Sequence, residues 1–292
     1  MENRRQTVLV TGASGCIGNK IYNLLSKKYN CVGTYYSRII PKGIKLDLTS
    51  KVEALKVFNQ VKPDIIIHAA AEKDPDQVKK NPQRTFKLNV EATRTIKDFA
   101  KNNLCKIIHL STSYVFPGKQ KGRYIETDKC LGVNDYSKTK IQAEKIIELH
   151  QNYIILRFDM VFGYNGPDKE NGLFGKIIKT KTEIGYDNKQ KRQPMFIDDI
   201  ARAVDFLLAN RQAGIFHLGS DLLTKYKICS QLESLLDRGK LYVVPRPWRP
   251  DQAKRPGIIH LDCSKIAKLG FRFHSIQKSL AIIKEQYNNS KR

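Results

Sequence analysis

The first 160 residues alternate between short apolar runs and longer amphipathic segments, and this alternation constrains the fold more than any other feature. The apolar runs, each short enough for a buried parallel strand, are 7–11, 31–36, 63–71, 106–113 and 153–158. The segments with helical spacing of apolar residues are 16–29, 50–61, 84–103 and 136–150. Strands that alternate with helices form right-handed βαβ units. The sequence therefore predicts an α/β fold with a doubly wound parallel sheet and helices on both faces.

The pattern loosens after the first 160 residues. A clear helix is predicted at 198–210, followed by a buried strand at 214–219. We expect a cofactor domain at 1–160 and a smaller, mixed substrate lobe at 161–292. Because strand 214–219 is as apolar as the first strands, we expect the segment 198–220 to return to the main domain.

Composition disfavours several classes of protein. No apolar run approaches the roughly 18–20 residues of a membrane span, and the N-terminus MENRRQTVLV has no apolar leader with a cleavage site. We therefore expect a cytoplasmic protein without a membrane partner. The six cysteines are scattered without a CxxC pair, which is typical of free thiols. Clustered ligand spacing is absent, so we predict no metal site.

The net charge is strongly positive. The chain has 52 Lys and Arg against 28 Asp and Glu, a formal net charge of +24. The basic residues are spread along the chain, with no block of five or six and no interleaving with aromatic residues. Nucleic-acid binding is therefore not favoured. The positive electrostatic potential of such a chain would also suit a small anionic ligand that carries phosphate groups.

A glycine-rich turn, TGASGCIG, connects the first strand to the first helix. Gly12, Gly15 and Gly18 would let the backbone approach a pyrophosphate, whose charge then lies at the helix N-terminus. Cys16 and Ile17 belong to the same turn. The spacing differs from the GxGxxG pattern of many dinucleotide sites. The alternative is a turn whose glycines only allow tight helix packing, but the strand-turn-helix context favours a Rossmann-like dinucleotide site.

The end of the second strand indicates the cofactor. An acidic residue there would accept a hydrogen bond from a ribose 2′-hydroxyl, whereas an arginine accommodates a 2′-phosphate. The stretch GTYYSRII has no acidic residue but contains Ser37 and Arg38. This favours NADP(H), with a solvated arginine as the alternative.

The third motif is YSKTK, which follows the strand HLSTS. Tyr136 and Lys140 are four residues apart on one helix face, and Thr112 ends a strand where open α/β sheets bind ligands. A phenol with a pKa near 10 is a poor acid at neutral pH, and a neighbouring ammonium lowers that pKa. We predict that these three residues form a catalytic trio; the alternative is a solvated surface helix.

Other titratable residues have plainer interpretations. His68, His109 and His217 lie in apolar runs and are predicted to be core residues. Asp198 and Asp199 open a helical pattern, where carboxylates commonly cap or favour the N-terminus, and capping is the default expectation.

With these motifs in order, the chain resembles the extended short-chain dehydrogenase/reductases, and more closely the dTDP-4-dehydrorhamnose reductase family. The resemblance runs from about residue 7 to 285. The matching stretches are LDL (46–48), HAAA (68–71), LNVEAT (88–93), STSYVFPGKQKGRYIETD (111–128), LR…VFG (156–163) and RPGIIHLDCSKIAKLGF (255–271).

The resemblance implies NADP(H) as cofactor and a nucleotide-linked 4-keto-6-deoxy sugar as substrate. Tyr136 would protonate the 4-keto oxygen as hydride arrives from the nicotinamide, and no metal would be needed. The implied cofactor-binding residues are Gly12, Gly15, Cys16, Ile17, Gly18, Ser37, Arg38, Asp47, Leu48, Ala69, Ala70, Tyr136 and Lys140. The implied substrate-binding residues are Thr112, Ser113, Tyr114 and Arg255. A homodimer is a further expectation from the resemblance.

The chain departs from the family pattern at three positions near the implied substrate. Ser113 stands where these reductases commonly have Asp, Asp159 where a small hydroxyl residue is expected, and Met160 where a Trp is usual. These departures concern the sugar more than the hydride chemistry. Relatives that epimerise the sugar have Cys at the position of Tyr114, so epimerase activity is not expected.

A second resemblance supports another hypothesis. The stretches 70–83, 223–236 and 255–270 are also similar to the regulatory beta subunit of methionine adenosyltransferase. That resemblance implies an NADP(H)-binding protein whose partner is a catalytic subunit. The sequence thus favours a reductase, with a regulatory subunit as the alternative.

Overall fold

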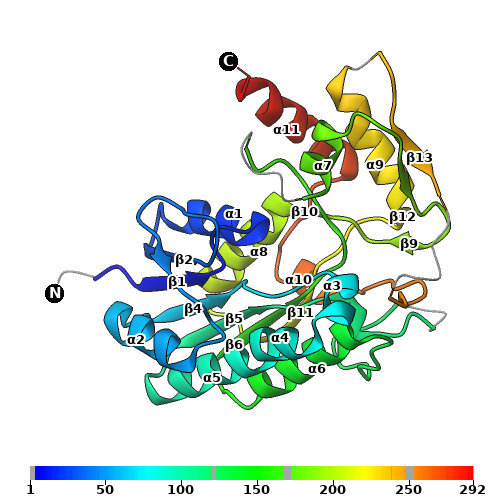
Figure 1. Cartoon of the computed structure of the whole chain (residues 1–292). Helices are drawn as coiled ribbons and strands as arrows, with labels where there is room; N and C mark the ends of the chain where they lie inside the picture. Colours follow the sequence, from blue (N-terminus) through cyan, green and yellow to red (C-terminus); the bar gives the residue numbers. More distant parts are fainter. Residues whose placement is uncertain (1–3, 120–122, 167–171, 238, 247–252, 292) are drawn as a thin grey trace.

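A seven-stranded parallel sheet forms the centre of the computed structural model, which describes residues 4–119, 123–166, 172–237, 239–246 and 253–291. The strand order is β3-β2-β1-β4-β5-β6-β11, the doubly wound arrangement expected from the sequence (Figure 1). Every pairing within this sheet is parallel. The strands are β1 (Thr7–Thr11), β2 (Asn30–Tyr35), β3 (Ile44–Lys45), β4 (Ile65–His68), β5 (Lys106–Leu110), β6 (Tyr153–Arg157) and β11 (Gly214–His217).

Helices cover both faces of the sheet, because successive strand residues point to opposite sides. Val8 and Val10 pack into a core with one helix layer, while Leu9 between them packs into the core of the other layer. The first layer is α1 (Cys16–Leu25) and α8 (Ile197–Ala209). The second layer is α2 (Lys51–Val61), α5 (Ala92–Asn102) and α6 (Asp135–Glu148), and the two layers lie above and below the sheet in Figure 1.

The helix predicted at 84–103 is interrupted. It consists of α4 (Pro82–Phe86), a π-helical turn at Lys87–Glu91 and then α5. The extra residue of a π turn redirects a side chain, here Asn89, whose amide nitrogen donates to the Glu72 carbonyl at 3.0 Å and to Thr139 Oγ1 at 3.2 Å. The preceding helix, α3 (Pro75–Lys80), was not predicted.

The second lobe stands above one end of the sheet in Figure 1. Its core joins residues of three helices, α7 (Leu173–Lys179), α9 (Lys225–Glu233) and α11 (Ile276–Asn289). Three small two-stranded sheets pair β7 with β10, β8 with β13 and β9 with β12. These strands are β7 (Val161–Phe162), β8 (Ile184–Tyr186), β9 (Lys191–Arg192), β10 (Met195–Phe196), β12 (Leu223–Thr224) and β13 (Val243–Pro245). The remaining helix, α10 (Ser264–Lys268), lies next to β11.

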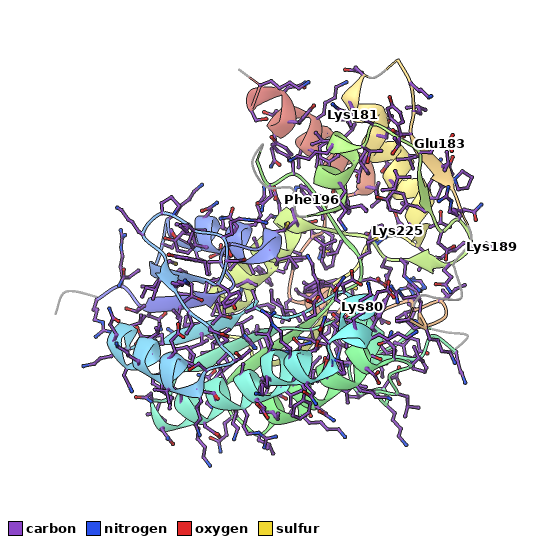
Figure 2. The ribbon with its side chains drawn as sticks, viewed as in Figure 1. Lys80, Lys181, Glu183, Lys189, Phe196 and Lys225 are labelled. Atoms are coloured by element: carbon purple, nitrogen blue, oxygen red, sulfur yellow. The ribbon has the colours of Figure 1, made fainter. Side chains whose placement is uncertain are left out.

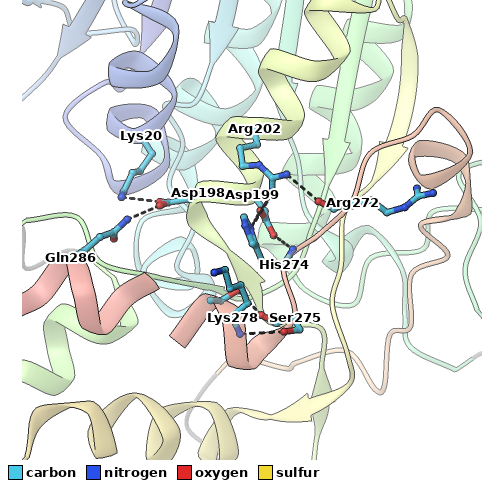
Figure 3. Close-up of polar contacts among 10 residues, drawn as sticks. Lys20, Asp198, Asp199, Arg202, Arg272, His274, Ser275, Lys278 and Gln286 are labelled. Carbon is cyan, nitrogen blue, oxygen red and sulfur yellow. Dashed lines mark hydrogen bonds and ion pairs between the residues drawn. The ribbon is translucent and has the colours of Figure 1, made fainter. Parts of the chain in front are cut away.

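The two lobes are joined by two carboxylates in the first turn of α8 (Figure 3). Asp198 Oδ1 forms an ion pair with Lys20 Nζ and its Oδ2 accepts from Gln286 Nε2, both at 2.8 Å. Asp199 accepts from the backbone N–H of His274 at 2.8 Å and from its Nδ1 at 2.6 Å. Both carboxylates lie in the first turn of the helix, as expected, but the expectation that they cap it is wrong, because the N-cap position makes no side-chain hydrogen bond. They instead bind cationic and amide partners from α1 and the C-terminal segment.

Charge is distributed over the whole molecule rather than gathered on one element. Figure 2 labels Lys80 on α3 and Lys181, Lys189 and Lys225 on the second lobe, so lysines lie on both lobes. Among the described residues, no helix is long and apolar enough to cross a membrane.

Candidate functional site

The glycine turn is packed so closely that side chains would not fit. Gly12 has a φ of +66°, and a Cβ there would lie 2.9 Å from the backbone of Ala70. A Cβ on Gly18 would lie 2.3 Å from the Gly12 carbonyl oxygen. The turn leads directly into α1 at Cys16, and the first N–H groups of a helix have no partner within it. This arrangement suits an anion such as a pyrophosphate.

Arg38 and Ser37 follow β2 and lie beside this turn. Arg38 Nη1 donates to the Ser14 carbonyl oxygen at 3.4 Å, which holds the guanidinium against the turn, while Ser37 is exposed. A guanidinium in this position could bind a phosphate on the ribose.

The other implied cofactor residues have clear local roles. Asp47 Oδ1 accepts from the backbone N–H and the hydroxyl of Thr49, at 2.9 and 2.7 Å. Leu48 is buried in the core beneath α2. Ala69 and Ala70 are half-buried directly after β4, and Ala70 faces the glycine turn.

Thr112 and Tyr136 come together at the carboxyl edge of the sheet. Tyr136 lies in the first turn of α6, which begins with a capping box between Asn134 and Ser137. Burial raises the pKa of the Tyr136 phenol, and a hydrogen bond with the Thr112 hydroxyl opposes that rise. At neutral pH the phenol therefore keeps its proton, which places a protonated acid beside a second hydroxyl.

Lys140 lies one turn further along α6, where its ammonium is fully buried. Its Nζ is 2.8 Å from the Leu110 carbonyl oxygen and 2.9 Å from His109 Nε2. Because an ammonium only donates, His109 accepts and is neutral. Burial and the nearby Lys140 charge hold the pKa of His109 well below its usual value, and burial lowers the pKa of Lys140 to about 8.

The expected depression of the Tyr136 pKa by Lys140 is therefore not observed in this arrangement. The raised pKa of Tyr136 follows from burial, while the hydrogen bonds of Lys140 go to His109 and Leu110. Sequence spacing places the two side chains on one helix face, but it does not specify which acceptors the ammonium meets.

The implied substrate residues continue from the same strand end. The Ser113 backbone N–H donates to the Phe158 carbonyl oxygen at 2.8 Å, so the segments after β5 and β6 run side by side. The Tyr114 and Tyr136 rings meet edge to face, with centroids 6.0 Å apart. Asp159 is buried next to them, and its charge contributes to raising the pKa of both phenols.

Two cations approach this region from the second lobe. The Arg192 guanidinium lies 5.6 Å from the centre of the Tyr114 ring, and its Nη2 donates to the Pro256 carbonyl oxygen at 2.9 Å. Arg255 Nη2 forms an ion pair with Asp76 Oδ2 at 2.8 Å. The structure thus places Arg255 in a contact between α3 and the C-terminal segment.

Sequence reasoning missed Arg192, Asp76 and Asn89. Arg192 and Asp76 have no local pattern that marks them. Asn89 lies within the stretch LNVEAT, but its redirection by the π turn is a feature of the folded helix. Within the described ranges, no three His, Cys, Asp or Glu side chains come together as a metal site would require.

The histidine predictions are confirmed as far as burial is concerned. His68, His109 and His217 are each at most 2% exposed. His68 contacts Thr11 Oγ1 at 3.0 Å and Thr93 Oγ1 at 3.1 Å, so it connects β1, β4 and α5.

Comparison with known proteins shows which families this chain is similar to. A family model described as the RmlD substrate binding domain matches residues 6–289. Methionine adenosyltransferase 2 subunit beta from Xenopus laevis is 30% identical over 285 residues, which cover 90% of this chain and 82% of the relative. A dTDP-4-dehydrorhamnose reductase from Aggregatibacter actinomycetemcomitans is 27% identical over 277 residues, which cover 89% of this chain and 91% of the relative.

The fold is also that of a solved structure. A dTDP-4-dehydrorhamnose reductase from Bacillus anthracis, in complex with NADP, superposes with a TM-score of 0.84 at 23% identity, covering 98% of this chain and 100% of that one. The predicted doubly wound α/β architecture is confirmed, and both resemblances drawn from the motifs correspond to relatives found by comparison.

Proposed function

The chain belongs to the RmlD substrate binding domain family, and from that premise we propose that it is an NADPH-dependent reductase. Its substrate would be a nucleotide-linked 4-keto-6-deoxy sugar of the dTDP- or UDP-4-dehydrorhamnose type. The observation that supports this most is the buried Tyr136 phenol with Thr112 as its hydrogen-bond partner; the same chain has a closely packed glycine turn at the start of α1.

The residues of the first lobe fit a dinucleotide phosphate. The turn at Gly12 and Gly18 excludes side chains, so a pyrophosphate could approach the backbone there. Arg38, held against the turn by its bond to Ser14, would contact the 2′-phosphate. Lys140 would hold the nicotinamide ribose. When bound, NADPH would supply the hydride for the carbonyl carbon.

The chain's own side chains would supply the proton. Tyr136 keeps its proton at neutral pH because burial raises its pKa, so it can donate to the carbonyl oxygen only as negative charge develops there. Thr112 would donate a hydrogen bond to the same oxygen or to the phenolate left behind. The Lys140 ammonium, one helical turn away, is held by His109 and Leu110, so it would act on the nicotinamide ribose rather than lower the pKa of the phenol.

The proposal assigns separate tasks to the lobes. Residues 1–160 would bind the cofactor and 161–292 would bind the nucleotide-sugar. The segment 198–220 would serve the first domain, which agrees with the pairing of β11 with β6 and the packing of α8 on α1.

Turnover with NADPH tests the proposal directly. We expect purified protein to oxidise NADPH when mixed with a dTDP- or UDP-4-keto-6-deoxy-L-hexose. Tyr136→Phe should lower kcat by about 10²–10⁴-fold, because it removes the general acid, and it should leave the affinity for NADPH intact. Tight NADPH binding without oxidation on a panel of such sugars would contradict a reductase.

Arg38 tests the cofactor preference. Arg38→Ala should weaken NADPH binding by about 10–100-fold, the effect of losing charge-assisted hydrogen bonds, and should change NADH binding little. Fluorescence titration of both cofactors measures the ratio. Equal losses for the two cofactors would show that Arg38 acts through the glycine turn rather than through the phosphate.

A second function has its own support. The Xenopus laevis methionine adenosyltransferase 2 subunit beta is slightly more identical to this chain than the Aggregatibacter reductase, and Asp159 and Met160 depart from the reductase pattern. The alternative is an NADP(H)-binding regulatory subunit. Co-elution with a methionine adenosyltransferase catalytic subunit on size exclusion, together with no sugar turnover, would establish it.

A further inference from the structure

His109 is a buried histidine in which one ring nitrogen is bonded and the other is not. Its Nε2 lies 2.9 Å from Lys140 Nζ, and its Nδ1 has no hydrogen-bond partner among the described residues. The residue is 1% exposed. Because an ammonium only donates, Nε2 has no proton, and the proton of the neutral ring is on Nδ1. The tautomer that accepts from Lys140 therefore leaves a buried N–H group unpaired.

The neighbouring His68 shows how a structural histidine is bonded in the same place. It lies opposite His109 in the register of β4 and β5, with the ring centres 5.3 Å apart. Thr93 Oγ1 donates to the Asn89 carbonyl oxygen at 2.8 Å, so it accepts from His68 Nε2, which is 3.1 Å away. His68 Nδ1 then accepts from the Thr11 hydroxyl at 3.0 Å. Both nitrogens of His68 thus have partners within the fold.

The unpaired N–H group of His109 is explained by the ammonium and not by the core. Folded proteins rarely keep a buried N–H group without a partner, because it lowers stability. In the opposite tautomer of His109, the proton on Nε2 would face the N–H groups of Lys140, and that nitrogen could accept nothing. The contact with Lys140 therefore selects the tautomer at a cost in stability.

The two acceptors of Lys140 fix the direction of its third N–H group. An ammonium has three N–H groups, and the Leu110 carbonyl oxygen and His109 Nε2 each accept from one of them. The direction of the remaining group is set once the other two are bound. With the Leu110 carbonyl alone, the ammonium could rotate about a single hydrogen bond.

Both acceptors are uncharged, so neither neutralises the Lys140 charge. Glu144, one turn further along α6, raises the pKa of Lys140, but its carboxylate is in the ion pair with Arg157. Burial has the larger effect and lowers the pKa of Lys140 to about 8. A hydrogen bond donated by the ammonium favours the charged form, so the acceptor at His109 preserves the charge to a higher pH.

We propose that His109 is a positioning residue, whose unprotonated Nε2 directs the third N–H group of Lys140 to a hydroxyl of the nicotinamide ribose. This rests on the proposed function, because it takes NADP(H) as the ligand and Lys140 as the residue that holds its ribose. Without the acceptor, the ammonium is misdirected and loses its proton at a lower pH.

The other groups around Lys140 keep their charge state between pH 6 and pH 9.5. His68 has a pKa of about 3, and the pKa of His109 is held well below its usual value. Burial raises the pKa of both Tyr114 and Tyr136. The side chains that are buried in the segment 75–102, which packs against α6, are uncharged: Val78, Thr85, Asn89, Val90, Ala92, Thr93, Thr95, Ile96, Phe99 and Ala100.

The pH dependence of NADPH binding tests the acceptor. In fluorescence titrations between pH 6 and pH 9.5, wild-type affinity should fall above about pH 8, the pKa of Lys140. In His109→Leu the fall should begin about one pH unit lower, because the charged form loses a hydrogen bond. His109→Gln offers an amide oxygen near the position of Nε2, so its curve should agree with the wild type within about 0.3 pH unit.

His150→Leu is the matched control. His150 is 7% exposed, and its Nε2 contacts the Cys105 carbonyl oxygen at 2.8 Å, just before β5 begins. Its loss should lower stability and leave the pH dependence of NADPH binding unchanged. If His109→Leu also shifted no curve, or if His109→Gln shifted its curve as far as His109→Leu, the proposal would be overturned.

The tautomer can be measured in the wild type, where no variant has to fold. Nitrogen-15 NMR of protein with labelled histidine should show His109 as a neutral ring with its proton on Nδ1, and His68 as a neutral ring with its proton on Nε2. A proton on His109 Nε2 would overturn the proposal, because that nitrogen could not accept from Lys140.

These measurements separate the proposal from the reductase itself. NADPH binding with the expected shift, but without oxidation on the sugar panel, would contradict the reductase and leave the role of His109 standing. Oxidation of NADPH by a sugar, with no shift in His109→Leu, would contradict the role of His109 and leave the reductase standing. A wild type that does not bind NADPH would overturn both.

Discussion

Two buried charged clusters lie two residues apart on the chain, one at the end of β6 and one just after it. Arg157 forms an ion pair with Glu144 at 2.8 Å, both side chains being 3% exposed. Glu144 also accepts from the Ser111 hydroxyl, and Arg157 donates to the Glu126 carbonyl oxygen at 3.0 Å. Asp159, by contrast, is an acid without an ion-pair partner among the described residues; its Oδ1 accepts from the Met160 N–H at 2.7 Å, and the Ser113 hydroxyl favours its charged form.

The contrast between Glu144, which has an ion-pair partner, and Asp159, which has none, separates structural from functional polar groups. A buried ion pair with its remaining hydrogen bonds satisfied is part of the folded framework, and removing one partner is expensive. A buried charge that is only half satisfied lowers stability in the free protein, so it is not expected to serve the framework. Arg157 and Glu144 hold β6 and α6 together, whereas we expect Asp159 to contribute little to stability.

We expect the largest loss of stability when the Arg157–Glu144 ion pair is broken. Glu144→Gln should lower the free energy of unfolding by about 3–5 kcal/mol, because Arg157 would be left as an uncompensated buried charge. Urea unfolding measures the loss. Glu148→Ala, an exposed glutamate on the same helix, is the control and should stay within about 0.5 kcal/mol. A loss below 1 kcal/mol for Glu144→Gln would remove the distinction between the clusters.

The fold was predictable because its signal is local and repeated. The alternation of Val8, Leu9 and Val10 between two cores follows from strand geometry alone, and Ser50 caps α2 by accepting from the Glu53 N–H, as serine commonly does at a helix start. The strands of the second lobe are only two or three residues long, too short for any periodicity. Their pairing arises from packing between distant segments.

The site was predictable only in part. Thr112 and Tyr136 could be paired from the sequence because strand end and helix start are fixed by the βαβ order, and the structure joins them. Arg192 reaches Tyr114 from a segment about eighty residues away that has no motif. The choice of His109 as an acceptor for Lys140 depends on side-chain packing between β5 and α6, which spacing does not encode.

The next prediction concerns the pH dependence of activity and the charge of Lys140. Arg157, in contrast, stays charged in its ion pair with Glu144. Below about pH 8 Lys140 is an ammonium, and above it the charge is lost, since burial lowers its pKa to about 8. We expect kcat/KM for the reductase to fall about tenfold per pH unit above that value, because the ammonium proposed to hold the nicotinamide ribose is lost. His68, with a pKa of about 3, does not titrate in this range.

The pH–rate profile between pH 6 and 10 measures this. Lys140→Arg is the control for charge, because a guanidinium stays protonated, and its residual activity should not decline above pH 8. A wild-type profile that is flat to pH 10 would show that the ammonium of Lys140 is not required for turnover.

The last variant, Asp159→Asn, should change the free energy of unfolding least, and in the opposite direction from Glu144→Gln. Asp159→Asn should raise the free energy of unfolding at pH 7.5 by about 0.5–2 kcal/mol, a common gain when a site that favours function over stability is neutralised. The folded pKa of Asp159 is raised, so the wild type gains stability as pH falls through that pKa and the carboxylate is protonated.

The advantage of Asp159→Asn should therefore shrink on acidification, and urea unfolding at pH 7.5 and pH 4.5 compares the two proteins. Ser113→Asp, which adds a second carboxylate beside Asp159, should lower the stability at pH 7.5 and recover on acidification, because like charges that share a site cannot both ionise cheaply. If Asp159→Asn were instead as destabilising as Glu144→Gln, Asp159 would be part of the framework in the same sense as Glu144.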